Sequence, residues 1–271
     1  NHKPALPLFT KLEVEEVISL FEIMPRDEWF SVESDVQVRF RRSGHIIGSS
    51  FVEIDIPTEK NRKRITFSGD FGTKRSHFLK GPVYLKETDV LVLESTYGDR
   101  LIPRDDTLEQ LEKIIKNVHK RNGILLIPAF AIGRSQEMIY LIRRLEDEGR
   151  IPIQPVILDS PMAIRATEIA INHKEDHTLD TSFLSEGDNF HPKQFEISQS
   201  ADDSFLNCMR EGPFIVISAS GMLSGGRILH HLKKRLPEHE NCVLFCGYQA
   251  DSTKGRFLQD NKENLENIRI H

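Results

Sequence analysis

The sequence predicts an α/β protein with a β-rich first part and a second part built on a parallel sheet. Short, alternating strand patterns occupy residues 36–97, and continuous apolar runs alternate with helix patterns over residues 107–246. Continuous apolar runs are typical of strands buried on both faces, and parallel strands are joined by helical crossovers. We therefore expect a buried parallel sheet with right-handed crossovers in the second part.

The first part begins with a helix pattern and continues as strands. Residues 8–21 have apolar positions at helical spacing, and Thr10 with Glu13 suits a capping box. Residues 36–56 alternate around a glycine-containing turn, which is typical of antiparallel strands. Two further strands are expected, at residues 64–68 and 90–93.

The second part alternates helices and strands up to residue 246. The expected elements, in order, are helix 107–119, strand 124–128, helix 134–148, strand 156–159, helix 162–171, strand 214–218, helix 226–236 and strand 242–246. Residues 173–200 are polar and show no clear periodicity. Residues 267–271 resemble one more strand, so we expect the intact protein to continue beyond this sequence.

Composition limits the classes of function without choosing one. The 271 residues are 38% hydrophobic and 28% charged, which suits one large domain or two ordinary ones. The formal net charge of −5 gives no global attraction to nucleic acid, so a polyanion would have to meet a local basic groove. No apolar run reaches the roughly 18 to 20 residues of a membrane span, and no signal-peptide pattern opens the sequence. We expect a soluble, cytoplasmic protein with no membrane partner.

The three cysteines predict no disulfide framework. Cys208, Cys242 and Cys246 are an odd number in a long chain, which favours a reducing compartment. Cys242 and Cys246 would share one face of a strand, and a cysteine-only zinc site there would lack two ligands. We expect a buried structural role for this pair.

Residues that can bind a metal stand at the ends of strands in the first part. His45 follows Gly44, Asp70 follows Gly69, and Glu94 ends the apolar run at residues 90–93. Imidazole and carboxylate groups suit a divalent transition metal. Each also has an ordinary alternative, because a Gly-His pair can be a simple turn and a Gly-Asp pair an Asx turn. The three together, in one β-rich part of the sequence, support metal ligation more than any one of them does alone, and the ordinary alternatives stay open.

Six segments, in order, resemble motifs of the metallo-β-lactamase-fold β-CASP family of RNA nucleases. They are residues 43–50, 67–72 and 93–98, which resemble two metal motifs and the first β-CASP motif, and residues 127–137, 218–222 and 246–250, which resemble later β-CASP segments. The similarity spans nearly the whole chain. It implies an incomplete metallo-β-lactamase αββα sandwich with an inserted β-CASP domain, whose parallel sheet is Rossmann-like. Residues 1–97 would form the partial metallo-β-lactamase domain, residues 98–256 the β-CASP domain, and residues 257–271 would return towards the first domain.

The resemblance also implies roles for residues. His45 would be a ligand of one zinc ion, and Asp70 would bridge two zinc ions as a metal ligand and catalytic residue. Glu94 would hydrogen-bond an active-site histidine from beyond this sequence, which would fix the orientation of that imidazole. Two zinc ions would hold the scissile phosphate and acidify a water.

The departures from the family pattern limit what this sequence can do alone. The His-x-His-x-Asp-His signature, which supplies most metal ligands in the family, is absent from residues 1–271. The pairs His173 and His177, and His230 and His231, match no family motif, and we expect them to be solvated. Lys233-Lys234-Arg235 is likewise expected to be a solvated helix face. Two ligands are too few for a tight site, so we expect this segment alone to be inactive.

Three turns at strand ends are candidates for binding nucleic acid, because open parallel sheets place ligands at the carboxyl ends of their strands. The candidate residues are Gly133, Arg134, Ser135, Ser218, Ser220, Gly221, Ser224, Lys254 and Arg256. Helix-opening amides and basic side chains could hold phosphates there. The alternative is that these glycine and serine residues only cap helices. Ser252 replaces a glycine usual in the family, which changes only the local turn.

The function expected for the intact protein is zinc-dependent hydrolysis of RNA phosphodiester bonds, endonucleolytic or exonucleolytic. Single-stranded RNA would lie in the cleft between the domains, and a homodimer is a candidate assembly. A non-catalytic RNA-binding scaffold, a DNA-directed nuclease of the same family and a hydrolase of small molecules are the alternatives.

Overall fold

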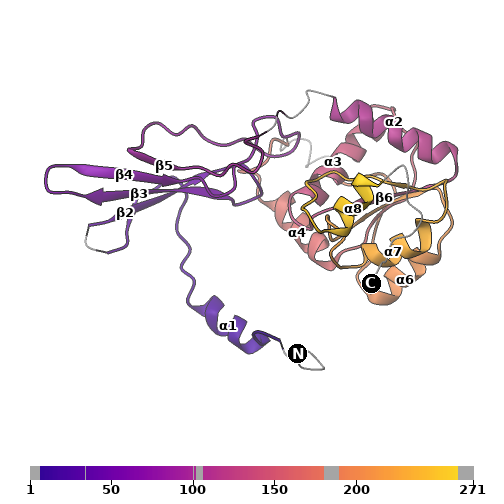
Figure 1. Cartoon of the computed structure of the whole chain (residues 1–271), viewed down its shortest axis with the longest axis horizontal. Helices are drawn as coiled ribbons and strands as arrows, with labels where there is room; N and C mark the ends of the chain where they lie inside the picture. The colour runs from indigo at the N-terminus through magenta and orange to yellow at the C-terminus, as the bar shows by residue number, and fades with distance from the viewer. Residues whose placement is uncertain (1–6, 34, 100, 102–105, 180–188, 262–271) are drawn as a thin grey trace. The chain divides into compact units, whose positions relative to one another are not determined.

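The computed structural model describes residues 7–33, 35–99, 101, 106–179 and 189–261 (Figure 1). Two compact units are distinguished, and each contains one five-stranded sheet. The first unit comprises Asn1–Arg42, Ser50–Gly69 and Val83–Glu94, and the second comprises Ser43–Ser49, Asp70–Pro82 and Ser95–His271. The chain therefore passes between the units several times before residue 97. The domain boundaries expected from the family resemblance stay a prediction.

The first unit contains a helix followed by a mixed sheet. Helix α1 (Lys11–Ser19) begins at the capping box that Thr10 forms with Glu13, as the sequence predicts. The strands are β1 (Phe30–Ser31), β2 (Gln37–Arg42), β3 (Ser50–Pro57), β4 (Arg62–Phe67) and β5 (Val90–Val92). They lie in chain order, and neighbours are antiparallel except for the parallel pair β4 and β5. The strands expected in the first part are confirmed.

A buried ion pair fixes the register of β2 and β3. Arg39 lies opposite Glu53 across the two strands, and its Nη2 is 2.8 Å from the Glu53 Oε2 atom. Arg41 Nη1 approaches the same oxygen at 3.5 Å. Glu53 is almost fully buried, so a shift in register would leave its carboxylate without these cations at considerable cost. The ends of the loop between β2 and β3, which carries His45, are thereby fixed.

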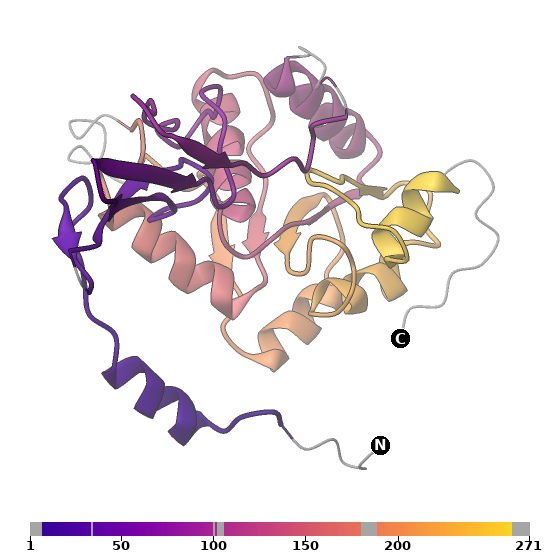
Figure 2. The ribbon, with the colours of Figure 1, turned by 60° about the vertical axis from the view of Figure 1, so that its left-hand side comes forward.

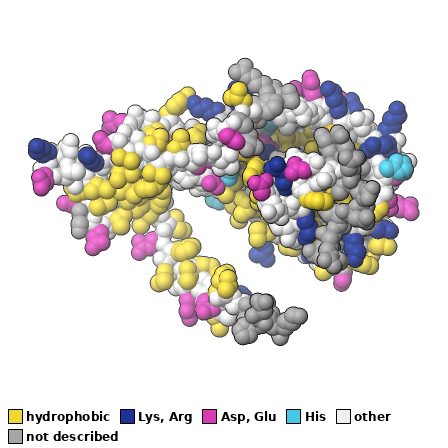
Figure 3. All heavy atoms as spheres, in the orientation of Figure 1, with side chains coloured by type: hydrophobic (Ala, Val, Ile, Leu, Met, Phe, Trp, Pro, Cys, Tyr) yellow, Lys and Arg dark blue, Asp and Glu magenta, His cyan; other side chains and the backbone are white. Residues whose placement is uncertain are grey.

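Strand β5 is apolar on both faces but is not buried. Val90, Leu91, Val92 and Leu93 are between 47% and 60% exposed, although successive side chains of a strand point to opposite faces. Figure 3 shows hydrophobic side chains gathered over the strands of the first unit. The run has the composition of a strand covered on both sides. Within the described part of the chain, this edge of the sheet therefore remains open to solvent.

The second unit contains an entirely parallel sheet, as predicted. Its strands are β6 (Ile124–Pro128), β7 (Val156–Leu158), β8 (Phe195–Ile197), β9 (Phe214–Ser218) and β10 (Cys242–Val243). Their order is β10-β6-β9-β7-β8, and every neighbouring pair is parallel. All residues of β6 and β9 are buried, because these strands have neighbours on both sides and helices on both faces.

Helices cover both faces of this sheet (Figures 1 and 2). One face packs against α2 (Thr107–Lys120), α3 (Arg134–Asp147) and α4 (Pro161–Asn172), and the other against α7 (Ile228–Arg235) and α8 (Lys254–Asp260), with α6 (Ala201–Met209) beside α7. Along β6, Leu125 and Ile127 join the first core, whereas Ile124 and Leu126 join the second. No described helix is long and apolar enough to cross a membrane.

Four elements of the second unit differ from the sequence-based prediction: three were missed, and the end of one was misplaced. The polar stretch 173–200 contains the edge strand β8, and α6 follows it. The capping box of Ser200 with Asp203 marks the start of α6 and could have revealed it. Helix α8 was also missed, and β10 ends at Val243 rather than at residue 246. The strand expected at residues 267–271 lies outside the described residues.

The cysteine thiols of the second unit are free and held in apolar surroundings. Cys208 is buried, and Cys242 and Cys246 are half-buried against the core. Burial raises the pKa of Cys208 and of Cys246 to about 11. Both groups are therefore protonated thiols at neutral pH. Burial raises the pKa of Cys242 as well, which suits the structural role expected for Cys242 and Cys246.

We expect Ile215→Ala to destabilise the second unit strongly, because Ile215 is fully buried in the central strand β9. Loss of a buried isoleucine should lower the free energy of unfolding by about 2–5 kcal/mol. Ile197→Ala is the matched control, because Ile197 lies on the edge strand β8 and is partly exposed, and it should cost less than about 1 kcal/mol. Urea denaturation measures both, and equal losses would contradict the assigned core.

Candidate metal and nucleic-acid site

The candidate site depends on the close approach of two backbone segments, one around Gly44 and one around Gly72. The Gly72 N–H donates to the Ser43 carbonyl oxygen at 2.9 Å. A Cβ atom on Gly72 would lie 1.9 Å from the Gly44 oxygen, so only glycine fits without a backbone shift. Gly44 itself has a φ of +71°, a conformation that glycine adopts readily. Two loops distant in sequence are thereby held in direct contact.

This contact brings His45 and Asp70 together. His45 Nε2 is 3.8 Å from Asp70 Oδ2, and the two side chains are 47% and 79% exposed. The shared metal site that the family resemblance implies requires these side chains to be neighbours, and the structure places them so. Both belong to the second unit, although they lie within the β-rich part of the sequence.

Ser49 organises the loop that carries His45. Its hydroxyl oxygen accepts the N–H groups of His45 at 3.0 Å and of Ile46 at 3.1 Å, and the hydroxyl donates to the Ile46 carbonyl at 2.8 Å. Ser43 donates its own hydroxyl to the Ser49 hydroxyl at 3.0 Å. The buried Ser43 and the half-buried Ser49 therefore close the turn and fix the backbone from which the imidazole projects.

Apolar contacts attach the same loops to the parallel-sheet core. Ile47 packs against the core that contains α3 and α4, and Phe78 and Leu79, which follow Asp70, are buried in it. A Cβ atom on Gly133 would lie 2.9 Å from Ile46 Cγ2, which shows how closely Ile46 approaches the start of α3. The loops of the candidate site are thus part of the second unit by packing, although they lie within the β-rich part of the sequence.

The pair fits part of a zinc site but does not complete one. Two ligand atoms on one tetrahedral zinc ion lie roughly 3.4 Å apart, close to the separation seen between His45 and Asp70. Within the described residues, no group of three or more His, Cys, Asp and Glu side chains could hold a metal ion. His45 and Asp70 can therefore supply two donors, and the remaining ligands would have to come from elsewhere.

Glu94 lies where the sequence predicts, directly after β5. Its backbone N–H donates to the Ser68 hydroxyl at 2.9 Å, which ties the end of β5 to the end of β4. The residue is half-buried and belongs to the first unit. Its expected role beside a histidine stays a prediction.

The turn before α3 contributes one accessible cation. Arg134 is partly exposed and forms an ion pair with Glu137 one turn later. Ser135 is buried, and its hydroxyl donates to the Phe130 carbonyl at 2.7 Å. The Gly133 N–H donates to Gln136 Oε1 at 2.7 Å. Of these three candidates, the Ser135 hydroxyl is unavailable to a nucleic acid in this structure, because it closes the turn.

In the turn after β9, too, some candidate polar groups are bonded within the fold and others remain accessible. Ser218 is buried, and its hydroxyl donates to the Asp159 carbonyl at 2.8 Å, so this candidate also serves the fold. Gly221 is buried, and its carbonyl accepts from the Gln249 amide at 3.0 Å. Ser220 and Ser224 are more open, and their hydroxyl oxygens lie 3.2 Å apart. These two hydroxyls remain candidates for contact with a phosphate.

Lys254 and Arg256 lie in the first turn of α8, which is capped by the Thr253 side chain. Arg256 is 41% exposed and pairs with Asp260 at 2.7 Å and with Asp251 at 3.2 Å. These carboxylates raise the pKa of its guanidinium, which is therefore charged at any physiological pH. A phosphate at this turn would have to compete with the two carboxylates for Arg256.

A buried polar cluster lies below the turn after β9. The Asp159 carboxylate accepts from Ser204 at 2.6 Å, from His231 Nε2 at 2.7 Å and from Arg227 at 2.9 Å. Burial opposes ionisation of Asp159, but the bonds from His231, Ser204 and Arg227 outweigh it and hold the pKa of this carboxyl below its ordinary value. Arg227 also donates to the Ser198 carbonyl at 2.8 Å. The cluster ties β7, α6 and α7 together.

The solvated role expected for the histidine pairs and the basic run is wrong at three positions. His173 and His230 are exposed, as expected, but His177 and His231 are almost fully buried. Arg235 is buried too, and it donates to the Cys208 carbonyl at 2.9 Å, whereas Lys233 and Lys234 are exposed. In α7 the inward residues are Ile228, His231, Leu232 and Arg235. Their i, i+3, i+4 and i+7 spacing is the signal that could have shown that His231 and Arg235 face the sheet.

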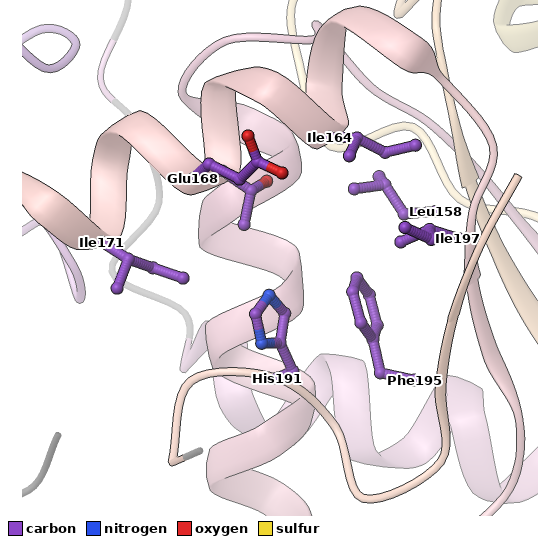
Figure 4. Close-up of a pocket in the computed structure, with 8 residues that line it drawn as sticks. Leu158, Ile164, Glu168, Ile171, His191, Phe195 and Ile197 are labelled. Carbon is purple, nitrogen blue, oxygen red and sulfur yellow. The ribbon is translucent and has the colours of Figure 1, made fainter. Parts of the chain in front are cut away.

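Two concavities of the second unit lie apart from the strand-end turns. One, of about 310 Å³, is lined by α4, β8 and His191 (Figure 4). Ile164 and Ile171 of α4 and Phe195 of β8 give it a mainly apolar wall. The other, of about 550 Å³, lies between α6 and α7 beside Lys233 and Lys234. Of the predicted site residues, none lines either concavity.

The parallel sheet with helices on both faces is an α/β architecture, and residues 135–258, which contain four of its five strands, match the family model of the Beta-Casp domain. The chain belongs to the metallo-β-lactamase-fold β-CASP family, as the six motifs predict.

Three relatives illustrate the similarity. The chain is 31% identical over 252 residues to Ribonuclease TTHA0252 of Thermus thermophilus, covering 92% of this chain and 57% of that protein. It is 32% identical over 266 residues to Transcription termination factor FttA of Pyrococcus horikoshii, covering 93% and 39%. It is 29% identical over 259 residues to the RNase J-like protein of Methanocaldococcus jannaschii, covering 94% and 59%. The chain thus spans 39–59% of the length of these relatives.

We expect Gly72→Ala to separate the two site loops, because its Cβ atom would meet the Gly44 carbonyl. The resulting overpacking should lower the free energy of unfolding by about 1–3 kcal/mol. Gly247→Ala is the control, since a Cβ atom there would meet nothing within 4 Å. Chemical denaturation compares the variants, and a Gly72→Ala protein as stable as the wild type would contradict the close approach.

We expect His177 to make stability depend on pH below neutrality. Burial lowers the pKa of His177 from its ordinary value of 6.5, so the unfolded chain binds a proton there before the folded chain does. The contribution of His177 to the free energy of unfolding is therefore fully present above pH 6.5. It is lost as pH falls from 6.5 towards the pKa of His177 in the folded protein. His177→Phe should reduce the slope of unfolding free energy against pH by up to about 1.4 kcal/mol per pH unit in that window.

The control for this prediction is His173→Phe, because His173 is exposed on the same segment. Its slope should match that of the wild type in urea denaturation between about pH 7.5 and about pH 5. Identical slopes for all three proteins would refute a titrating His177.

Proposed function

We propose that the intact protein is a zinc-dependent hydrolase of RNA phosphodiester bonds that acts in RNA processing. The observation that carries this proposal is the exposed pair of His45 Nε2 and Asp70 Oδ2, 3.8 Å apart. Relatives named as ribonucleases and as a transcription termination factor support RNA as the substrate. The chain spans 39–59% of those relatives, so the activity is proposed for the whole protein and not for residues 1–271 alone.

In this proposal the side chains of the two joined loops hold the metal. His45 would supply an imidazole nitrogen and Asp70 a carboxylate oxygen to the metal, and the other ligands would come from outside the described residues. Glu94 orients one of those ligands, a histidine, by accepting its second ring N–H. Zinc bound there would stabilise charge on the phosphoryl oxygens and lower the pKa of a bound water to about 7.

The strand-end turns would bind the RNA backbone. Ser220 and Ser224 offer hydroxyls, and the partly exposed Arg134 and Arg256 offer guanidinium groups that suit phosphate. Lys254 adds a further cation at the start of α8. This short polar and basic surface fits the acidic overall charge, because only a local groove would attract the polyanion.

A catalytic role is favoured over the scaffold alternative by the site loops themselves. A protein that only binds RNA gains nothing from a glycine contact that holds a solvent-exposed histidine and aspartate together. Cleavage of single-stranded RNA and of DNA of the same sequence distinguishes the proposed function from a DNA-directed nuclease. We expect the RNA to be cleaved in preference.

We expect Asp70→Asn in the full-length protein to abolish most RNA cleavage, because an amide cannot neutralise two metal cations. The rate should fall by about a hundredfold or more, and zinc content should fall with it. Cleavage of labelled single-stranded RNA and elemental analysis measure the two effects. Asp202→Asn, which removes an exposed carboxylate at the start of α6, should leave both unchanged. An Asp70→Asn protein of unchanged rate would defeat the metal role of Asp70.

A further inference from the structure

Within the second unit, Asp176 connects the segment after α4 to the loop that carries His45. Its Oδ2 accepts the N–H of Gly48 at 2.8 Å, although the two residues are 128 positions apart in sequence. Asp176 is 97% buried, that is, 3% exposed. A buried carboxylate is costly unless it accepts hydrogen bonds, so this bond is a defined contact and not an incidental surface one.

Asp176 is itself held firmly in place. Its carbonyl accepts the Lys80 N–H at 2.8 Å, and its N–H donates to the His173 carbonyl at 3.2 Å. The ring of the next residue, His177, stacks on Phe78 with centroids 5.6 Å apart. The carboxylate therefore projects from backbone that is fixed on both sides.

The bond reaches His45 through the serine-closed turn. Gly48 precedes Ser49, whose hydroxyl oxygen accepts the N–H groups of His45 and Ile46. A displacement of Gly48 would move Ser49 and, with it, the backbone from which the imidazole projects. On the other side of the loop, the Ser43 carbonyl accepts the Gly72 N–H of the Asp70 segment. Asp176 thus fixes one end of the turn, and Gly72 fixes the other.

We propose that Asp176 is a positioning residue that holds the His45 imidazole in the orientation needed to bind a metal together with Asp70. This inference rests on the proposed zinc site. Asp176 does not touch the metal or the substrate; it acts through Gly48 and Ser49. The Gly48 N–H needs an acceptor oxygen on the side chain at position 176. Asparagine has such an oxygen, and alanine does not.

The first part of the test measures the loop without reference to metal. Hydrogen exchange followed by mass spectrometry should show faster exchange of a peptide covering residues 43–49 in Asp176→Ala than in the wild-type full-length protein. Asp176→Asn should restore slow exchange, because its side-chain oxygen can still accept the Gly48 N–H. Glu175→Ala is the matched control, since it removes the neighbouring carboxylate, which is exposed and pairs with His173.

The second part measures metal binding. The full-length variants are titrated with zinc against a chelator, and cobalt is added as a spectroscopic probe of ligand geometry. Asp176→Ala should weaken zinc binding by about 10- to 100-fold and change the visible cobalt bands, because residues that orient metal ligands have effects of this size. Asp176→Asn and Glu175→Ala should bind like the wild type and give its cobalt spectrum.

The outcomes separate this inference from the proposed function. Faster exchange together with weaker metal binding in Asp176→Ala, both rescued by Asp176→Asn, supports the positioning role. Unchanged exchange, or faster exchange with an unchanged affinity and cobalt spectrum, overturns it. A wild-type full-length protein that binds no zinc would contradict the proposed function, and with it the metal-positioning role, before any variant is compared. If Asp176→Ala does not fold, Asp176→Ser takes its place. The serine side chain is too short to reach the Gly48 N–H, so the same exchange and metal-binding measurements decide between the same outcomes.

Discussion

The structure of the candidate site depends on the absence of two side chains, at Gly44 and Gly72. Because Gly72 has no Cβ atom, its backbone contacts that of Gly44, and its N–H reaches the Ser43 carbonyl at 2.9 Å; Gly44, in turn, leaves room for the backbone of residues 80–82. Hydrogen bonds of Ser49 and Asp176 then fix the His45 loop in that place. The 3.8 Å separation of His45 from Asp70 is the result of these backbone contacts and not of attraction between the two exposed side chains.

Much of this architecture was predictable from the sequence. The alternation of apolar runs with helix patterns predicted the parallel sheet, and the motifs around His45 and Asp70 predicted that these residues would be neighbours. The edge strand β8 was not predictable by pattern, because it has only three residues and one partner strand. Burial of His177 was also hidden, because it depends on stacking with Phe78, about a hundred residues earlier in the chain.

The strand-end serines show why residue type alone could not identify a binding surface. Ser218 and Ser220 are two positions apart, yet the first is buried on the Asp159 carbonyl and the second lies beside Ser224. The Ser135 hydroxyl likewise donates to a carbonyl in its own turn. Which hydroxyl remains available is decided by the carbonyls that neighbouring strands and turns present, and those are known only from the fold.

The bond between Asp176 and Gly48 has a consequence for the order in which the protein acquires its structure during synthesis. Chains emerge from the ribosome starting with the amino terminus, and domains generally fold as units. The turn around His45 leaves the ribosome early, but its anchor emerges only after 128 more residues have been added. The nascent turn must therefore wait for α4 and the segment after it, so the placement of His45 beside Asp70 is completed only after β6, β7 and the helices α2 to α4 have been synthesised.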